Sequence, residues 1–349
     1  MNTQISSSFR SRASFCESPY EISIIIVHYN TPQLTLDCIA SLRRHVQHIQ
    51  YEVIVIDNAS EQNIEQLLSP SESSVRVIRL SRNCGFAVAA NVGMANAGGE
   101  FFFLLNSDTM LLENTPQAML DHMLLNSEIG ILGPRQIDKE GRFTPSCGKF
   151  PSLIREMIRK ILHARLSSNN YRLRDYMDQK FSDLSHVDWV SGSCMMIRRK
   201  ALFETGLFDE RFFMYFEDID LCKRVQAQGW KIVYYPNHTL LHYGGQSARL
   251  NIMNVLLANR RSQLYFCHKY YGIVGTSVLR FLLMIKYFFN LSKSFALHAF
   301  FRFTEKKRRQ YFTHALISKK LLGLVMTPFS NDPLIPSLPA SSLLGSTKK

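Results

Sequence analysis

Four short apolar runs alternate with segments of helical length in the first third of the chain, and this alternation restricts the fold more than any other feature. The runs are rich in β-branched and aromatic residues and continuously apolar, which is typical of strands buried on both faces of a parallel sheet. Strand–helix–strand order predicts a doubly wound α/β sheet. The predicted strands cover residues 22–28, 52–58, 75–80 and 101–108, and the predicted helices cover 32–46, 61–68 and 86–97, the last closed by Gly98 and Gly99.

The chain beyond the fourth predicted strand continues this pattern less regularly. Residues 135–188 lack a clear period and are partly basic, so they are predicted to form a variable connection over the site. Residues 189–198 and 231–235 are predicted to be strands, and residues 217–228 a helix that Gly229 ends. One α/β domain over residues 21–250 is therefore expected.

The formal net charge of +13 is concentrated at one end of the chain. Residues 251–349 contain 15 Lys and Arg residues against two acids, Glu305 and Asp332, whereas the preceding residues carry equal numbers of basic and acidic side chains. The sheet half is thus neutral, and the basic end matches no nucleic-acid-binding module. No nucleic-acid partner is predicted.

The cysteines and the N-terminal residues bear on the compartment. Seven cysteines are scattered along the chain without a Cys-x-x-Cys pair, which is typical of a reducing cytosol. The apolar run at residues 22–27 is too short for the core of a signal peptide. We therefore expect no export, with residues 1–20 as a flexible tail.

The basic end is predicted to associate with a membrane. Residues 280–302 form a helical pattern with one apolar stripe, which is typical of a helix lying in a membrane interface. Residues 306–309 add a basic cluster suited to anionic headgroups. The alternative is a core-packing helix with a solvated charge run. Charges interrupt the apolar stretch, so a clean transmembrane helix is not expected. We predict a basic helical membrane-associating region over 251–330 and a disordered tail over 331–349.

Polar residues follow the predicted strands at their carboxyl ends, where ligands bind in open α/β sheets. Asp57 could accept a hydrogen bond from a nucleobase or ribose, and Tyr29 could stack on the base. The alternatives are an Asx-turn at Asp57 and a packed tyrosine. After the third strand, a loop entering a helix could point N–H groups at phosphate. The candidate ligand-binding residues are Tyr29, Asn30, Asp57, Asn58, Asn83, Gly85, Phe86, Asn91 and Asn106.

Asp108 and His242 are the candidate metal ligands. Asp108 follows an apolar strand, where its carboxylate could hold a hard cation against phosphate oxygens. His242 follows another predicted strand and precedes two glycines. A shell of imidazole, carboxylate and phosphate favours Mg²⁺ or Mn²⁺. The alternatives are a helix cap at residues 106–108 and a surface histidine.

Asp218 is the candidate general base. Glu217 and Asp218 follow an aromatic run, and apolar surroundings can raise the pKa of a carboxyl and suit it to proton transfer. The alternative is structural, because acids in a first helical turn complement the helix dipole and Asp220 can pair with Arg224.

Seven segments together resemble, in order, the family 2 glycosyltransferases of GT-A fold, and within them the bacterial rhamnosyltransferases that build O-antigen and cell-wall glycans. These segments span residues 21–250. They are IIIVHYN, VIVIDNAS, NCGFAVAANVG, LLNSD, WVSGSCMMIRR, FDERFFMYFEDIDLCKR and HYGGQS.

The resemblance implies an inverting transferase at the cytoplasmic face of the plasma membrane, acting in cell-surface polysaccharide synthesis. Its first candidate reaction moves L-rhamnose from dTDP-rhamnose to a lipid-linked glycan acceptor. The resemblance places Tyr29, Asp57 and Asn58 at the nucleobase, Asn83, Gly85 and Asn91 along the donor, Asp108 and His242 at the metal, and Asp218 as the base.

One residue departs from the family's pattern. The metal motif in its fuller form is Asp-x-Asp, and this chain has Asn106 at the first position. An amide oxygen can ligate a cation or contact ribose but brings no charge, so the affinity for the metal is expected to be lower. A sugar nucleotidyltransferase of similar fold is the nearest alternative, but no Gly-rich, basic triphosphate loop follows the first strand.

Overall fold

The computed structural model of the protein describes residues 20–68, 74–152, 176, 178–245, 252–301 and 304–327. The chain divides into two compact units, one built mainly from residues up to 245 and the other from the helices that follow, together with the short segment Arg211–Phe216. The predicted tails, residues 1–20 and 331–349, lie outside the described residues except for Tyr20.

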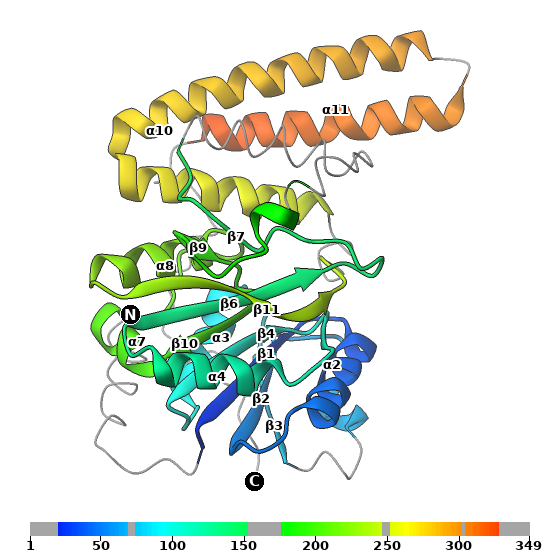
Figure 1. The fold of residues 1–349 in the computed structure, drawn as a ribbon. Helices are drawn as coiled ribbons and strands as arrows, with labels where there is room; N and C mark the ends of the chain where they lie inside the picture. The colour runs from blue at the N-terminus through cyan, green and yellow to red at the C-terminus, as the bar shows by residue number, and fades with distance from the viewer. Residues whose placement is uncertain are drawn as a thin grey trace. The chain divides into compact units, whose positions relative to one another are not determined.

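A nine-stranded sheet forms the centre of the first unit, and its N-terminal half is parallel, as predicted (Figure 1). The strand order in this half is β3-β2-β1-β4, and β1 pairs in parallel with both of its neighbours. The carboxyl ends of these strands therefore meet at one edge. The strands are β1 (Ile22–His28), β2 (Tyr51–Asp57), β3 (Val75–Arg79) and β4 (Phe101–Asn106).

The second half of the sheet is mixed and continues in the order β10-β6-β11-β5. β10 runs antiparallel to both β4 and β6, so β6 and β11 point the same way as β4. The carboxyl ends of β6 and β11 thus reach the same edge as those of the parallel half. The strands are β6 (Ile129–Ile137), β10 (Cys194–Arg198), β11 (Lys231–His242) and β5 (Thr109–Leu111), with β8 (Ser185–His186) beside β11 and a separate pair of β7 (Cys147–Gly148) and β9 (Trp189–Val190).

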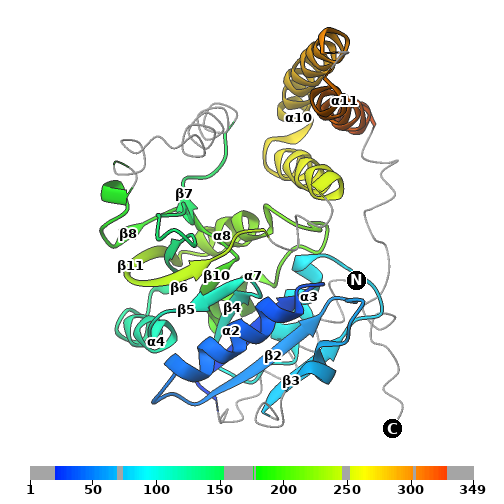
Figure 2. The ribbon, with the colours of Figure 1, turned by 90° about the vertical axis from the view of Figure 1, so that its right-hand side faces the viewer.

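Alternation along β1 shows how the sheet separates two layers of core. Ile22, Ile24 and Ile26 pack in one cluster, whereas Ile25 packs in the other, because successive side chains of a strand point to opposite faces. Helices cover both faces (Figures 1 and 2). One layer contains α2 (Pro32–His45) and α4 (Thr115–Leu125), and the other contains α3 (Phe86–Ala95), α7 (Arg199–Thr205) and α8 (Glu217–Ala227).

Several predicted elements differ from the observed ones. Residues 61–68 form only a 3₁₀ turn, η1 (Ile64–Leu67), begun by the Asn63 side chain. The predicted strand over residues 189–198 is split into β9 and β10 by a loop at residues 191–193. β11 is longer than predicted, because a register shift between Tyr235 and Thr239 lets it continue along β6.

Gly98 and Gly99 do not end α3, contrary to the prediction. The helix stops at Ala95, where the Asn96 side chain donates to the carbonyl of Val92. The amide of Gly99 instead donates to Ser23 Oγ at 2.8 Å, and a Cβ on Gly99 would lie 2.6 Å from the Ser23 backbone nitrogen. A glycine is required there by close approach to β1 rather than by helix termination.

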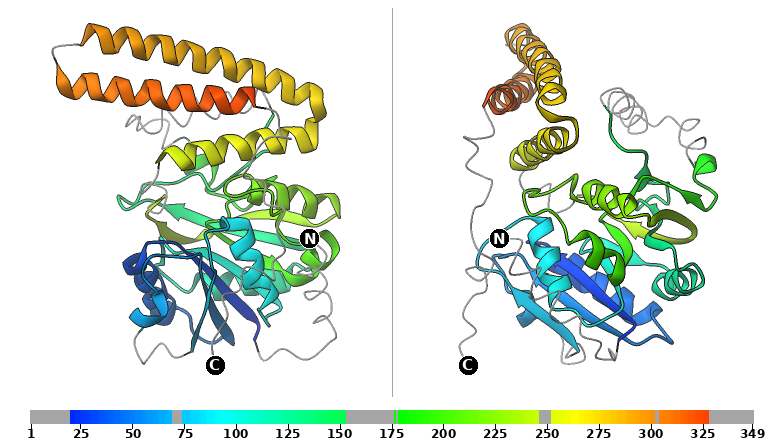
Figure 3. Two further views of the ribbon diagram at one scale, coloured as in Figure 1. Left: turned by 180° about the vertical axis from the view of Figure 1, so that it is seen from behind. Right: turned by 90° about the vertical axis from the view of Figure 1, so that its left-hand side faces the viewer.

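The second unit contains a helical hairpin (Figures 1 and 3). α10 (Ile252–Phe300) is two helices joined at Gly272, which has a φ of 65°, and α11 (Glu305–Met326) packs along its second part. The Arg280 guanidinium donates to the carbonyls of Val325 and Thr327 at the end of α11. The small hairpin core consists of Leu264, Cys267, Leu279, Leu283, Tyr287, Leu321 and Val325.

The hairpin keeps much of its apolar surface in solvent. Ile273 and Val274 are 75% and 78% exposed, and Phe288 and Phe289 are 65% and 66% exposed. Although charges at Lys286 and other positions argued against a clean spanning segment, α10 contains a stretch that is long and apolar enough to cross a membrane by length and composition. Residues 302 and 303, the end of the predicted stripe, lie outside the described residues.

Candidate active site

Asp108 and His242 lie side by side at the sheet edge, as the sequence predicted. β5 pairs antiparallel with β11 so that His242 lies opposite Thr109, the neighbour of Asp108. This register brings His242 Nε2 to 3.3 Å from Asp108 Oδ1. The helix-cap alternative for Asp108 is wrong, because β5 follows it directly and α4 begins later, capped by Asn114.

A buried glutamine orients the histidine, and sequence analysis missed it. Gln136, only 1% exposed, has its amide oxygen 3.0 Å from His242 Nδ1 and accepts a second hydrogen bond from Ser193 Oγ. An amide oxygen only accepts, so Nδ1 must carry the imidazole proton. In the neutral imidazole this leaves the lone pair on Nε2, the ring nitrogen nearest Asp108, which is the arrangement of a metal-binding histidine held by an outer partner.

The Asp108–His242 pair fits a divalent cation. Two neighbouring ligands of an octahedral cation, each at about 2.1 Å, lie roughly 3 Å apart, close to the 3.3 Å between Oδ1 and Nε2. Within the described ranges, no group of three His, Cys, Asp or Glu side chains could hold a metal. The pair can thus supply part of a coordination shell, and a phosphate-bearing ligand and water would have to complete it.

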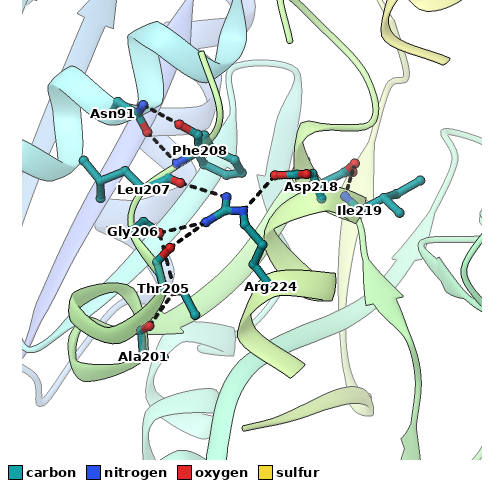
Figure 4. A network of polar contacts seen from close by, with 10 residues as sticks. Asn91, Ala201, Thr205, Gly206, Leu207, Phe208, Asp218, Ile219 and Arg224 are labelled. Carbon is teal, nitrogen blue, oxygen red and sulfur yellow. Dashed lines mark hydrogen bonds and ion pairs between the residues drawn. The ribbon is translucent and has the colours of Figure 1, made fainter. Parts of the chain in front are cut away.

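Asp218 lies in the first turn of α8, half-buried, with both carboxylate oxygens held by backbone amides. Ile219 N donates to Oδ1 at 2.8 Å (Figure 4). Gly192 N donates to Oδ2 at 3.0 Å. A Cβ added to Gly192 would lie 3.5 Å from both the Asp218 Cβ and the Phe86 ring. A carboxylate oxygen has two lone pairs, so one backbone bond to each oxygen does not by itself prevent the group from accepting a proton.

The loop between β9 and β10, residues 191–193, joins the two halves of the site. Gly192 binds Asp218, while the next residue, Ser193, accepts from Asn106 N at 2.9 Å and donates to Gln136. Consecutive residues of one loop therefore contact the candidate base, the end of β4 and the partner of His242. The structure brings Asp218, Asn106, Asp108 and His242 together around this loop.

Glu217, beside the candidate base, is a buried acid. It is 6% exposed, and its Oε2 has no hydrogen-bond partner among the described residues. Burial raises the pKa of Glu217 well above its ordinary value, and the neighbouring charge of Asp218 raises it further. Asp220, the third acid of this turn, pairs with Arg224 at 2.8 Å, which confirms the structural prediction for that residue.

Two of the candidate nucleotide-binding residues, Asp57 and Asn58, support loops at the ends of β2 and β3. Asp57 is fully buried, accepts from Ser60 N at 2.8 Å and lies 3.5 Å from the Arg79 guanidinium. The Asp57 side chain thus closes the turn after β2 through the residue three positions on, one residue later than in the Asx-turn given as the alternative. The Asn58 side chain accepts from Cys84 N and donates to Asn83 Oδ1, so it fixes the loop that enters α3.

The loop into α3 and the end of β1 carry four more candidates. Gly85 has a φ of 83° and begins α3, and its amide donates to Asn83 Oδ1. Asn30 also has a positive φ, of 52°, and its side chain accepts from Glu61 N. Tyr29 is half-buried between the ends of β1 and α2. The roles of these residues toward a donor stay predictions.

Asn91 is placed differently from its neighbours in the predicted set. It is buried, and its amide donates to the Phe208 carbonyl and accepts from the Phe208 amide, both at 2.9 Å (Figure 4). Phe208 also packs edge-on against Phe86. Asn91 therefore clamps the segment after α7 to α3, a contact between residues 117 positions apart.

Arg224 holds the same segment from the other side, and sequence analysis did not anticipate this role. Its guanidinium donates to the carbonyls of Thr205 and Leu207 at 2.9 and 2.8 Å (Figure 4). The same guanidinium pairs with Asp220. Five donors in a planar fork suit one arginine to several acceptors at once. The backbone leading toward residues 217 and 218 is thus attached to both α3 and α8.

Residues 23–206, more than half of the chain, match the family model of Glycosyl transferase family 2. The chain belongs to this family and is a glycosyltransferase, which confirms the resemblance seen in the sequence.

Relatives agree with this assignment. The N-acetylglucosaminyl-diphospho-decaprenol L-rhamnosyltransferase of Mycobacterium tuberculosis (strain ATCC 25618 / H37Rv) is 30% identical over 225 residues, which cover 61% of this chain and 73% of that protein. The low-salt glycan biosynthesis hexosyltransferase Agl10 of Haloferax volcanii is 26% identical over 61% of this chain and 64% of that protein.

A solved structure supports the predicted GT-A fold. GalNAc-T7, crystallised with UDP, GalNAc and Mn²⁺, superimposes with a TM-score of 0.50 at 14% identity. The alignment covers 74% of this chain and 52% of that chain. At this identity the similarity concerns the fold.

Proposed function

We propose that the protein is an inverting glycosyltransferase that moves L-rhamnose from dTDP-rhamnose to a hydroxyl of a lipid-linked glycan acceptor in cell-surface polysaccharide synthesis. The observation that carries this proposal is the loop at residues 191–193, which contacts the Asp218 carboxylate and the partner of the His242–Asp108 pair. This loop would keep a base for the acceptor close to the ligands for the donor's phosphates.

Asp218 would act as the base in a single displacement. The acceptor hydroxyl loses its proton to the carboxylate as its oxygen bonds to the anomeric carbon, and the bond from that carbon to the nucleoside diphosphate breaks. Attack opposite the leaving group inverts the configuration. The backbone bonds from Gly192 and Ile219 fix the carboxylate, so it is oriented before the substrates arrive.

Asp108 and the Nε2 of His242 would hold a divalent cation, Mg²⁺ or Mn²⁺. When bound, the cation would neutralise negative charge that grows on the departing diphosphate. Asn106 at the end of β4 would contribute an amide oxygen or contact the ribose. Asp57, Asn58 and Tyr29 would face the nucleobase, and the loop from Asn83 to Phe86 would face the donor's phosphates, with its Gly85 at the start of α3.

The choice of substrates rests on the relatives. The M. tuberculosis protein is named for transfer of L-rhamnose to a diphospho-decaprenol-linked sugar, and a further match is the rhamnosyltransferase WbbL of Escherichia coli, 40% identical over 63 residues. The exposed apolar residues of α10 and the basic residues 306–309 would bind an anionic membrane peripherally, at the cytoplasmic face. A lipid-linked acceptor would then be presented at the surface where the enzyme resides.

A nucleotide-release screen over dTDP- and UDP-sugars, with and without Mg²⁺ or Mn²⁺, tests this proposal. Rapid release from dTDP-rhamnose, dependent on acceptor and cation, is expected. Faster release from a UDP-hexose would mean that this sugar nucleotide, and not dTDP-rhamnose, is the donor. Equal rates before and after chelation would mean that the reaction needs no divalent cation. Formation of a nucleotide sugar from a nucleoside triphosphate would instead favour the nucleotidyltransferase alternative.

A further inference from the structure

The backbone immediately before Glu217 and Asp218 adopts an unfavourable conformation. Tyr215 and Phe216 have φ angles of 68° and 67°, in the left-handed region that residues with a Cβ rarely enter. Two consecutive residues of this kind persist only where surrounding contacts impose the conformation. Glu217, the first residue of α8, follows Phe216 directly. The backbone angles of Phe216 therefore set the direction in which the chain enters the first turn of α8, which contains Asp218.

The first part of α10 contacts the residues on both sides of Tyr215. Phe216 is 5% exposed and its ring centroid lies 5.5 Å from that of Phe266. Phe212 is fully buried and packs edge-on against Tyr265 at 4.8 Å. Between them, Ser262 Oγ donates to the Met214 carbonyl at 2.8 Å. We call these three contacts the aromatic clasp.

The clasp residues of α10 form one face of the helix. Ser262, Tyr265 and Phe266 are spaced three and four residues apart, and Lys269 follows at the next turn with its ammonium 5.8 Å from the Phe212 ring. The Arg211 guanidinium adds a contact over Tyr265 at 4.8 Å. Both ends and the middle of the segment Arg211–Phe216 are therefore attached to a single rigid element.

We propose that Ser262 and Phe266 are positioning residues for the general base. By holding Tyr215 and Phe216 in the left-handed region, the clasp would set the direction in which the chain enters Glu217 and Asp218 at the start of α8, and thereby the carboxylate that would accept the acceptor's proton. This inference rests on the proposed role of Asp218. It gives the helical region a part in catalysis separate from binding a membrane, because Ser262 and Phe266 lie before the Gly272 kink and the exposed residues Phe288 and Phe289 lie after it.

The test compares Ser262→Ala and Phe266→Leu with a matched change, Ser294→Ala, at a buried serine in the second part of the same helix. Each clasp variant is expected to lower kcat roughly ten- to hundred-fold with the donor KM unchanged, since a misplaced catalytic group costs turnover rather than binding. Ser294→Ala should keep wild-type kcat. Ser262→Thr, which retains the hydroxyl, should restore most of the lost rate.

A second pair of variants tests the backbone conformation itself. Tyr215→Asn keeps a residue that tolerates positive φ, whereas Tyr215→Val introduces a β-branched residue that disfavours it. We expect Tyr215→Val to lower kcat at least ten-fold more than Tyr215→Asn. Thermal unfolding identifies any variant that fails to fold. If one pair contains such a variant, the other pair, either the clasp variants or the Tyr215 variants, decides whether the clasp positions the base.

The outcomes separate this inference from the proposed function. Wild-type kcat in both clasp variants, an equal loss in Ser294→Ala, or no difference between the two Tyr215 variants would overturn the positioning role while leaving Asp218 as the base. Retained turnover in Asp218→Asn would overturn the proposed base and the clasp with it.

Discussion

The two units of the protein differ in where they place apolar and charged side chains. The sheet unit buries its large apolar residues in two layers and places buried polar side chains at one edge, as with Asp108 and Gln136. The hairpin has a small core, exposes residues such as Ile273 and Phe288, and carries the excess basic charge. A closed core with a polar edge serves chemistry, whereas an apolar surface flanked by cations is suited to a lipid surface.

The largest expected effect concerns the sheet unit. Asp218→Asn keeps the size of the side chain but cannot accept the hydroxyl proton, so kcat should fall about 10²- to 10⁴-fold. The dissociation constant for the donor, measured by calorimetry, should stay near the wild-type value because the base acts only during attack. Asp121→Asn, on the exposed side of α4, is the matched control. Near-normal turnover in Asp218→Asn would remove the proposed base.

The next effect tests whether the sheet edge holds a cation through His242. Gln136→Leu removes the acceptor that keeps the proton on Nδ1, and cation affinity should fall about 10- to 100-fold. Asp108→Ala should weaken donor binding at least as much, and only in the presence of the cation. The measurement is a titration of Mn²⁺ against donor binding. A cation-independent loss in Asp108→Ala would contradict the metal role.

A smaller effect is expected from the hairpin, where each basic residue would contribute about 1 kcal/mol to the proposed binding of an anionic membrane. Lys306→Ala together with Lys307→Ala should therefore weaken co-sedimentation with anionic vesicles roughly 30-fold at low salt. Activity on a soluble acceptor should be unchanged, because these residues are remote in sequence from the clasp. Lys319→Ala with Lys320→Ala, farther along α11, is the control. An equal loss there would show that binding follows net charge rather than this cluster.

The smallest effect is on stability and follows from the raised pKa of Glu217. Since the folded protein holds this proton more tightly than the unfolded chain, stability is lost as pH rises from about 4.5 through the folded-state pKa. Glu217→Gln removes the titrating group and should raise Tm by about 2–4 °C at pH 8, which corresponds to roughly 1 kcal/mol. The exposed Glu65→Gln should change nothing. An equal gain at pH 4 would mean that burial of charge is not the cause.

Local sequence patterns were sufficient to predict several strands and helices and several candidate site residues. β1, β2 and β3 and the helices α2, α3 and α8 lie within a few residues of their predicted bounds, because continuous apolar runs and helical periodicity are properties of short segments. The shorter 3₁₀ turn at Ile64–Leu67 shows the limit of such patterns, since eight residues of weak periodicity do not determine a helix.

The sequence by itself determined the α/β class, the polar residues at the ends of β1, β2 and β4, and the separation of a neutral sheet half from a basic end. Only the tertiary structure decided which distant residues form hydrogen bonds to the candidate site residues. Gln136 and His242 are 106 positions apart, and Gly192 meets Asp218 across 26 positions. The aromatic clasp likewise joins Met214 to Ser262 across 48 positions. Such contacts depend on strand register and helix packing, which are set by the whole core and not by the spacing of residues along the chain.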